Sequence, residues 1–154
     1  MHEHENVDVV KDAYRAVNEN NFDVLRECLD ENVKWFAIGP PHLIPTAGTR
    51  YGIEQVEQYF RLLQTSGELQ KLTPLEFIAE ENKVVAIGEQ ELNLVGNARA
   101  SRSPWVHVFT FRRGRICEFR AFYDTASAVS ALNAVIRTGK KLAPRLEPGI
   151  PAIF

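Results

Sequence analysis

Two glutamates, Glu89 and Glu91, are the residues whose spacing most directly suggests chemistry. They lie in residues 84–95, a stretch rich in β-branched side chains that predicts a strand, and residues two apart on a strand share a face. Val85 and Ile87 precede them on that face, so the pattern can direct both carboxylates toward an apolar interior. Desolvation and mutual repulsion would then favour protonation of one carboxyl group, as a general acid requires.

The same strand also allows a solvated carboxylate pair. Leu92 and Leu94 make the opposite face apolar as well, so the sequence leaves open which face is buried. If Glu91 lies at an open rim, both glutamates are hydrated and have no catalytic role.

Motifs for metals, nucleotides and covalent nucleophiles are absent from the sequence. It contains no His-x-x-x-His, Cys-x-x-Cys, Gly-x-Ser-x-Gly or glycine-rich phosphate loop. Cys28 and Cys117 fall in a helical and a strand pattern, which is typical of small buried hydrophobes rather than of a disulfide. We therefore expect no metal and no cofactor, and any reaction should proceed by general acid/base catalysis.

Composition narrows the classes of partner. A chain of 154 residues with 45% apolar and 25% charged residues is typical of one globular domain. A net charge of −2 excludes an electrostatic case for nucleic acid. No segment has the ~20 apolar residues of a membrane span, and residues 1–6 lack a signal-peptide pattern, so a cytoplasmic location is expected.

The elements that must position these residues follow from hydrophobic periodicity. Helices are expected at about 6–19, after Asn21, at 53–63 and at 126–136, and strands at 33–38, 72–79, 84–95, 104–111 and 115–123. Residues 39–50 read as a loop. This order indicates an α+β fold in which helices cover one face of an antiparallel sheet. We expect one domain, 1–139, followed by a proline-containing tail, 140–154.

Several short segments resemble a known family when they are taken in order. They are Asn21-Phe22-Asp23, Val33-Lys34-Trp35, Tyr51-Gly52, His107-Val108-Phe109-Thr110-Phe111-Arg112-Arg113-Gly114 and Phe119-Arg120-Ala121-Phe122-Tyr123-Asp124. Over residues 6–136 the chain resembles the SnoaL-like and ketosteroid-isomerase-like proteins of the nuclear-transport-factor-2-like superfamily. The resemblance implies a cone, in which a curved antiparallel sheet wraps the N-terminal helices around a central apolar pocket. It also implies a homodimer formed through the outer sheet face.

The resemblance identifies Tyr14 as the helix tyrosine that polarises an oxygen in ketosteroid isomerases. The carboxylate base of those enzymes falls on Trp35 and their acidic oxyanion donor falls near Val106, so the isomerase set is incomplete. The Asp-Arg-Asp arrangement of limonene-type epoxide hydrolases is incomplete too, because its arginine and first aspartate fall near Glu89 and Glu91. The best catalytic pair is then Glu91 with Tyr14, with Glu89 as a substitute.

The acid/base aspartate of SnoaL-like cyclases falls on Ala121, or on Asp124 if the register shifts. Asp124 has an alternative role, because it precedes the final predicted helix and can act as its N-cap.

The predicted Arg113-Gly114 turn pairs Val108 near Phe119 and Val106 near Ala121. By resemblance this face lines the cone, and the expected ligand-binding residues are Trp35, Tyr59, Phe77, Val106, Val108, Phe119 and Tyr123. Such an aromatic set is equally typical of an ordinary core. The opposite face, which carries His107 and Arg120, is then expected to be the dimer surface.

Three functions remain open. The first is a cofactor-free isomerase, cyclase or hydrolase that acts on a small lipophilic compound. The second is a noncatalytic binder of such a molecule, which the missing family carboxylates favour. The third is a dimeric interaction module whose aromatic sheet face is the working surface.

Overall fold

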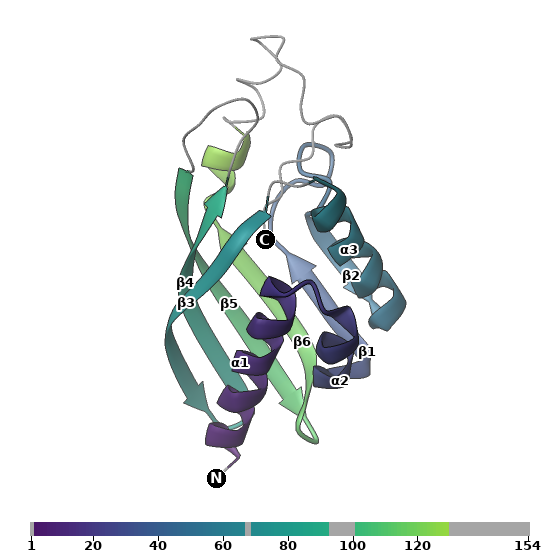
Figure 1. Cartoon of the computed structure of the whole chain (residues 1–154), viewed down its shortest axis with the longest axis vertical. Coiled ribbons are helices and arrows are strands. Elements are labelled where there is room, and N and C mark those ends of the chain that lie inside the picture. Colours follow the sequence, from purple (N-terminus) through teal and green to yellow (C-terminus); the bar gives the residue numbers. More distant parts are fainter. Residues whose placement is uncertain (1, 67–68, 93–100, 130–154) are drawn as a thin grey trace.

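The computed structural model describes residues 2–66, 69–92 and 101–129 and shows an α+β fold (Figure 1). Its helices are α1 (Glu3–Asn18), α2 (Phe22–Cys28) and α3 (Gly52–Ser66). On α1 the buried positions Asn6, Val10, Ala13 and Tyr14 recur at the three- and four-residue spacing of one helix face. At α2 the Asn21 side chain caps the helix, because its oxygen accepts a hydrogen bond from the Val24 amide at 3.3 Å.

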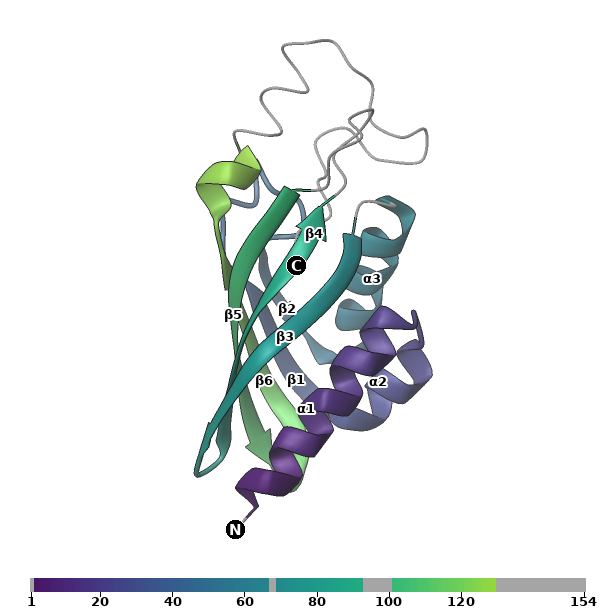
Figure 2. The same cartoon turned by 60° about the vertical axis from the view of Figure 1, so that its left-hand side comes forward.

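Six strands form one curved sheet, and the helices lie on its concave side (Figures 1 and 2). The strands are β1 (Leu29–Ala37), β2 (Gly48–Tyr51), β3 (Leu69–Glu80), β4 (Lys83–Leu92), β5 (Ser101–Arg112) and β6 (Arg115–Tyr123). Their order is β2-β1-β6-β5-β4-β3. The predicted α+β class is confirmed, but the sheet is mixed rather than antiparallel, since β1 pairs with β6 in parallel.

Strand β2 lies in the segment that the sequence predicts as a loop. It has only four residues and pairs with β1 at the edge of the sheet. Strands this short between proline- and glycine-rich turns carry too little periodicity to be seen in a sequence.

The β5–β6 hairpin follows the predicted turn and then departs from the predicted register. Phe111 pairs with Ile116, as the Arg113-Gly114 turn requires. A β-bulge then shifts the pairing by one residue, so that Phe119 lies opposite Phe109 rather than Val108.

On β5 the inner face is the one that the sequence pattern placed outside. Trp105, His107, Phe109 and Phe111 of β5 are all buried, whereas Val106 and Val108 lie on the outer face and are half-buried. Across the hairpin, the buried residues of β6 are Ile116, Phe119 and Ala121. The prediction that Val106 and Val108 line the cone is therefore wrong, because burying a row of large rings removes more apolar surface from water than burying two valines.

Aromatic packing closes the core between the sheet and the helices. Trp35 of β1 stacks on Phe119 with ring centroids 3.9 Å apart, and Phe60 of α3 meets Trp35 edge-on. No described helix is long and apolar enough to cross a membrane. The tail 140–154 lies outside the described residues, and of the predicted helix 126–136 the structure describes a helical segment at 125–129.

Candidate functional site

Tyr14 and His107 form a buried hydrogen-bonded pair on the concave side of the sheet. Their Oη and Nδ1 atoms are 2.7 Å apart, although the residues are 93 positions apart in sequence. Helix α1 supplies the tyrosine and β5 the histidine, which is fully buried. In the tautomer protonated at Nε2 the Tyr14 hydroxyl donates to Nδ1, so the pair can pass a proton from tyrosine to histidine.

Trp105 holds the imidazole in place from the adjacent inward position of β5. The two rings are stacked 4.0 Å apart, with 10° between their planes, and Tyr14 stacks on the same indole at 5.5 Å. Gly88 of β4 makes room for this indole. A Cβ atom at Gly88 would lie 2.4 Å from the Thr73 carbonyl oxygen and 2.5 Å from the Trp105 ring.

Burial keeps both members of the pair uncharged. Desolvation lowers the pKa of His107 well below its usual value, and desolvation raises the pKa of Tyr14 well above 10. A neutral imidazole keeps a lone pair on one ring nitrogen, which can take up a proton when a negative charge forms beside it. Among the described side chains, the buried polar ones are Asn6, Thr46, Gln90, Ser103 and His107. This described interior thus contains no buried carboxylate.

Two further tyrosines, Tyr59 of α3 and Tyr123 of β6, pack in or against the core. Burial raises the pKa of Tyr123 to about 12 and also raises that of Tyr59. The Arg50 guanidinium lies 4.8 Å from the Tyr59 ring centre and donates hydrogen bonds to the Thr46 and Pro45 carbonyls. This arginine is half-buried and is the charged group nearest to the Tyr59 ring among the described contacts.

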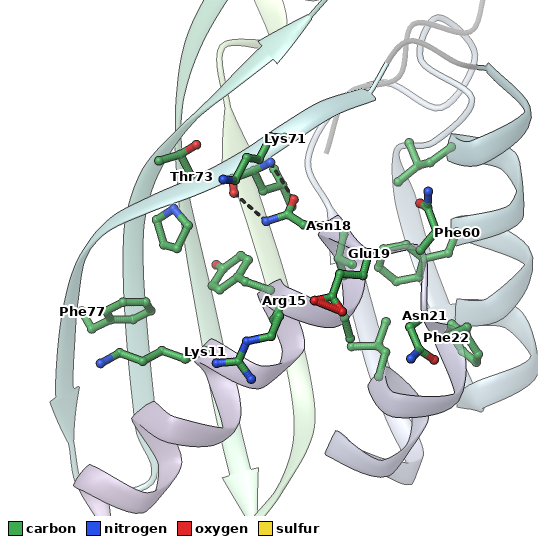
Figure 3. A pocket seen from close by; sticks show the side chains of 18 residues that line it. Lys11, Arg15, Asn18, Glu19, Asn21, Phe22, Phe60, Lys71, Thr73 and Phe77 are labelled. Atoms are coloured by element: carbon green, nitrogen blue, oxygen red, sulfur yellow. Dashed lines mark hydrogen bonds between the residues drawn. The ribbon is translucent and has the colours of Figure 1, made fainter.

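A groove of about 1040 Å³ opens beside Tyr14, between the C-terminal half of α1, the start of α2 and β3. Figure 3 shows Lys11 and Arg15 of α1 facing Phe77 of β3 across it. The apolar part of its lining comes from Tyr14, Ala16, Val17, Phe22, Leu25, Phe60, Leu63, Leu72, Pro74 and Phe77. Because Tyr14 belongs to the lining, the groove reaches the tyrosine side of the Tyr14–His107 pair.

Glu89, one of the two predicted carboxylates, does not lie on the Tyr14 side of the sheet. Alternate residues of β4 bury Val84, Ala86, Gly88 and Gln90, so Glu89 lies on the outer face. Its side chain is 41% exposed and forms an ion pair with Arg102 at 3.8 Å. The prediction that Glu89 enters the interior is wrong, because the parity of β4 is opposite to the one assumed. The Glu91 backbone pairs with Arg102 in the sheet, and its side chain lies outside the described residues.

Asp124 occupies the capping position. Its carboxylate accepts hydrogen bonds from the Ser127 amide at 3.0 Å and the Ser127 hydroxyl at 2.6 Å. These hydrogen bonds lower the pKa of the exposed Asp124 carboxyl group. The structure thus assigns Asp124 the structural role that the sequence analysis offered as its alternative.

The predicted ligand-binding aromatics share the concave side. Trp35, Tyr59 and Phe119 are fully buried in the core, and Phe77 and Tyr123 pack against it half-buried. Of this set only Phe77 lines the groove beside Tyr14.

His107, Trp105 and Gln90 were missed as inner-face residues by the sequence analysis. One signal could have found the first two, because the alternation Trp105, His107, Phe109, Phe111 is the bulkier and more apolar face of its strand. Gln90 can be assigned to the inner face in the same way only once it is known which face of β4 is buried.

Comparisons with known proteins agree with this geometry. Residues 10–119 match the family model of the SnoaL-like domain. An NTF2-like protein of unknown function from Burkholderia pseudomallei is 24% identical, with a TM-score of 0.74 over 82% of this chain and 96% of that one. TerC, co-crystallised with polyporic acid, is 20% identical with a TM-score of 0.74, over 80% of this chain and 94% of that one.

A proposed SnoaL-like polyketide cyclase from Jannaschia sp. CCS1 is 20% identical, with a TM-score of 0.69 over 84% of this chain and 92% of that one. No curated protein matches the sequence. At these identities the solved structures establish the fold, and the family match covers most of the described domain. The chain belongs to the SnoaL-like domain family.

Proposed function

We propose that the protein binds a small, uncharged, lipophilic compound against the concave side of the sheet and moves a proton on it without a cofactor. The observation that carries this proposal is the 2.7 Å contact between Tyr14 Oη and His107 Nδ1 beside a groove whose lining is partly apolar. Isomerisation and cyclisation next to a carbonyl group are reactions of this kind. The fold is shared with a proposed polyketide cyclase and with a protein crystallised with polyporic acid, which supports the proposal by analogy alone.

The proton relay needs no other group. A C–H bond next to the ligand's carbonyl breaks and leaves its electron pair in an enolate, while the proton moves to Tyr14 Oη. The tyrosine passes its own proton to His107 Nδ1, and the reverse sequence returns a proton to another carbon of the enolate. A neutral His107 is the required starting state, which its lowered pKa supplies.

Deuterium exchange into 2-tetralone, a bicyclic ketone with acidic C–H bonds, tests this step without knowledge of the natural substrate. The wild-type protein in D₂O should accelerate exchange above the buffer rate, as followed by mass spectrometry. Y14F keeps the ring but lacks the relay oxygen, and H107N cannot be protonated. Each should lower the protein-dependent rate by roughly 10²–10⁴-fold, the usual contribution of a positioned acid or base.

Matched controls are Y51F and H42N, since Tyr51 is 61% exposed and His42 is exposed. Both should keep the wild-type rate. If the wild type binds 2-tetralone without accelerating exchange, the protein is a noncatalytic binder. If E91Q abolishes exchange while H107N does not, the Glu91–Tyr14 pair predicted from the sequence carries the reaction instead.

We also propose that the protein forms a homodimer through the outer face of the sheet. Val106 and Val108 of β5, Ile87 of β4 and Phe122 of β6 lie on that face and are half-buried in the single chain. A second copy that presents the same face would bury them further. A cytoplasmic location is part of the proposal, and the two free cysteines, Cys28 and Cys117, support it, because reducing compartments keep thiols unpaired.

A further inference from the structure

Gln90 has a buried side-chain amide with no hydrogen-bond partner. The residue is 1% exposed, and neither Nε2 nor Oε1 has a hydrogen-bond partner among the described residues. A buried amide without hydrogen bonds destabilises a folded protein, because its hydrogen bonds to water are lost on folding and no others replace them. Such a group calls for a specific explanation.

Neighbouring strands present more unpartnered polar atoms on the same face. Trp105 of β5 is 1% exposed, and its Nε1 donor has no partner. Tyr123 of β6 lies directly opposite Trp105 in the sheet, and its buried hydroxyl has no partner either. Gln90 pairs with Ser103, two residues from Trp105 on the same strand face. Three adjacent strands thus offer one amide, one indole N–H and one hydroxyl to the interior.

Asn18, an exposed residue at the end of α1, carries a side-chain amide whose hydrogen bonds are satisfied and whose role is structural. Its Nδ2 donates to the Leu72 carbonyl and its Oδ1 accepts from the Leu72 amide, both at 2.9 Å. These bonds join the end of α1 to β3. Leu72 is also the β3 residue that pairs with Gln90, so the satisfied and the unsatisfied amide are close neighbours in the fold.

We propose that Gln90 and Trp105 form a recognition site for an uncharged fused-ring compound that carries a carbonyl group beside an N–H or O–H group. An amide offers a donor and an acceptor side by side, which is the complement of that pair. The inference deepens the proposed function and rests on its ligand site, because the Trp105 indole that would meet the ligand also stacks on His107.

The charge state of the ligand follows from the same surroundings. Burial keeps His107 and Tyr14 neutral, and the buried residues of the described part include no aspartate, glutamate, lysine or arginine. A charged ligand would lose its hydration there without gaining a counter-ion. Because the Gln90 amide has no contact with solvent, a ligand reaches it only after the side chains over it move aside.

The test uses 2-quinolone, whose ring carbonyl lies beside an N–H, and N-methyl-2-quinolone, which keeps the rings and the carbonyl but lacks the donor. Dissociation constants are measured by fluorescence titration. The wild-type protein should bind 2-quinolone at least about 10-fold more tightly than the methylated compound, in keeping with one lost hydrogen bond to a buried group. Q90M preserves the side-chain length without the amide and should abolish that preference.

Thermal unfolding separates a ligand-binding role from a structural one. Q90M should keep or raise the melting temperature of the free protein, since it removes an unsatisfied polar group. N18L removes the two hydrogen bonds of the satisfied amide and should lower the melting temperature. If Q90M lowers the melting temperature as N18L does, or if the preference survives in Q90M, the inference is overturned.

The two proposals can fail separately. A Gln90-dependent preference for 2-quinolone in H107N, whose proton transfer is disabled, supports the recognition site even if no exchange into 2-tetralone is found. Exchange that depends on His107, together with equal binding of both quinolones, retains the proposed chemistry and rejects the recognition site.

Discussion

At the residue scale, His107 is a titratable group that the fold holds uncharged. Its pKa lies well below the usual value because burial desolvates the imidazolium. The unfolded chain binds a proton at this histidine below about pH 6.5, whereas the folded chain does not. The free energy of unfolding should therefore contain the full contribution of the neutral His107 above about pH 6.5. It should decrease as the pH falls below that value, by up to about 1.4 kcal/mol per pH unit.

Urea unfolding of the wild type and H107N at pH 7.5, 6.5 and 5.5 measures this contribution. The wild type should lose stability between pH 6.5 and 5.5, and H107N should show a smaller loss over the same interval. H42N, which changes an exposed histidine, should behave as the wild type does. Equal pH dependence in the wild type and H107N would show that the imidazole is solvated in the folded state.

At the element scale, β4 owes its position beside β5 to Gly88. A methyl group there would meet a backbone oxygen and the Trp105 ring, both at distances well inside ordinary contact. G88A should therefore destabilise the protein by about 1–3 kcal/mol, the usual cost of overpacking a core. Displacement of the indole should also disturb the stack with His107.

Denaturant unfolding and near-UV circular dichroism check the Gly88 prediction. G88A should lower the unfolding midpoint and change the aromatic signal, whereas V85A, on the outer face of the same strand, should leave the aromatic signal unchanged. A G88A protein with wild-type stability and spectrum would mean that Trp105 does not pack over β4.

At the scale of the whole molecule, the sheet divides the protein into a helix-covered side and an uncovered side (Figure 2). Val108 is half-buried at the middle of the uncovered face, opposite Val85 and Arg120. A carboxylate introduced there would face its own copy across a two-fold interface, and burying two like charges is unfavourable. V108E should therefore convert the proposed dimer into a monomer.

Sedimentation velocity of the wild type and V108E tests the dimer. V24E is the control, because Val24 is 39% exposed on α2, away from the uncovered sheet face. The wild type and V24E should sediment as dimers. A wild-type monomer, or a V108E dimer, would show that the uncovered face is not the interface.

The helices and strands of this protein can be predicted from the sequence because their signals are local. The face of α1, the Asn21 cap, the Arg113-Gly114 turn and the Asp124 cap each depend on residues within a few positions of one another. Hydrophobic periodicity and turn chemistry therefore predict the helices, five of the six strands and the α+β class. The family resemblance, in addition, identifies Tyr14 as a candidate site residue.

Which side chains meet at the candidate site is decided by the tertiary structure. One bulged residue in β6 and the parity of β4 decide that His107 and Gln90 face inward and that Glu89 faces outward. The parallel pairing of β1 with β6, and the contact between Tyr14 and His107, join residues that are far apart in sequence. Strand register depends on how much surface both faces bury across the whole sheet, and a local sequence pattern does not reveal this total.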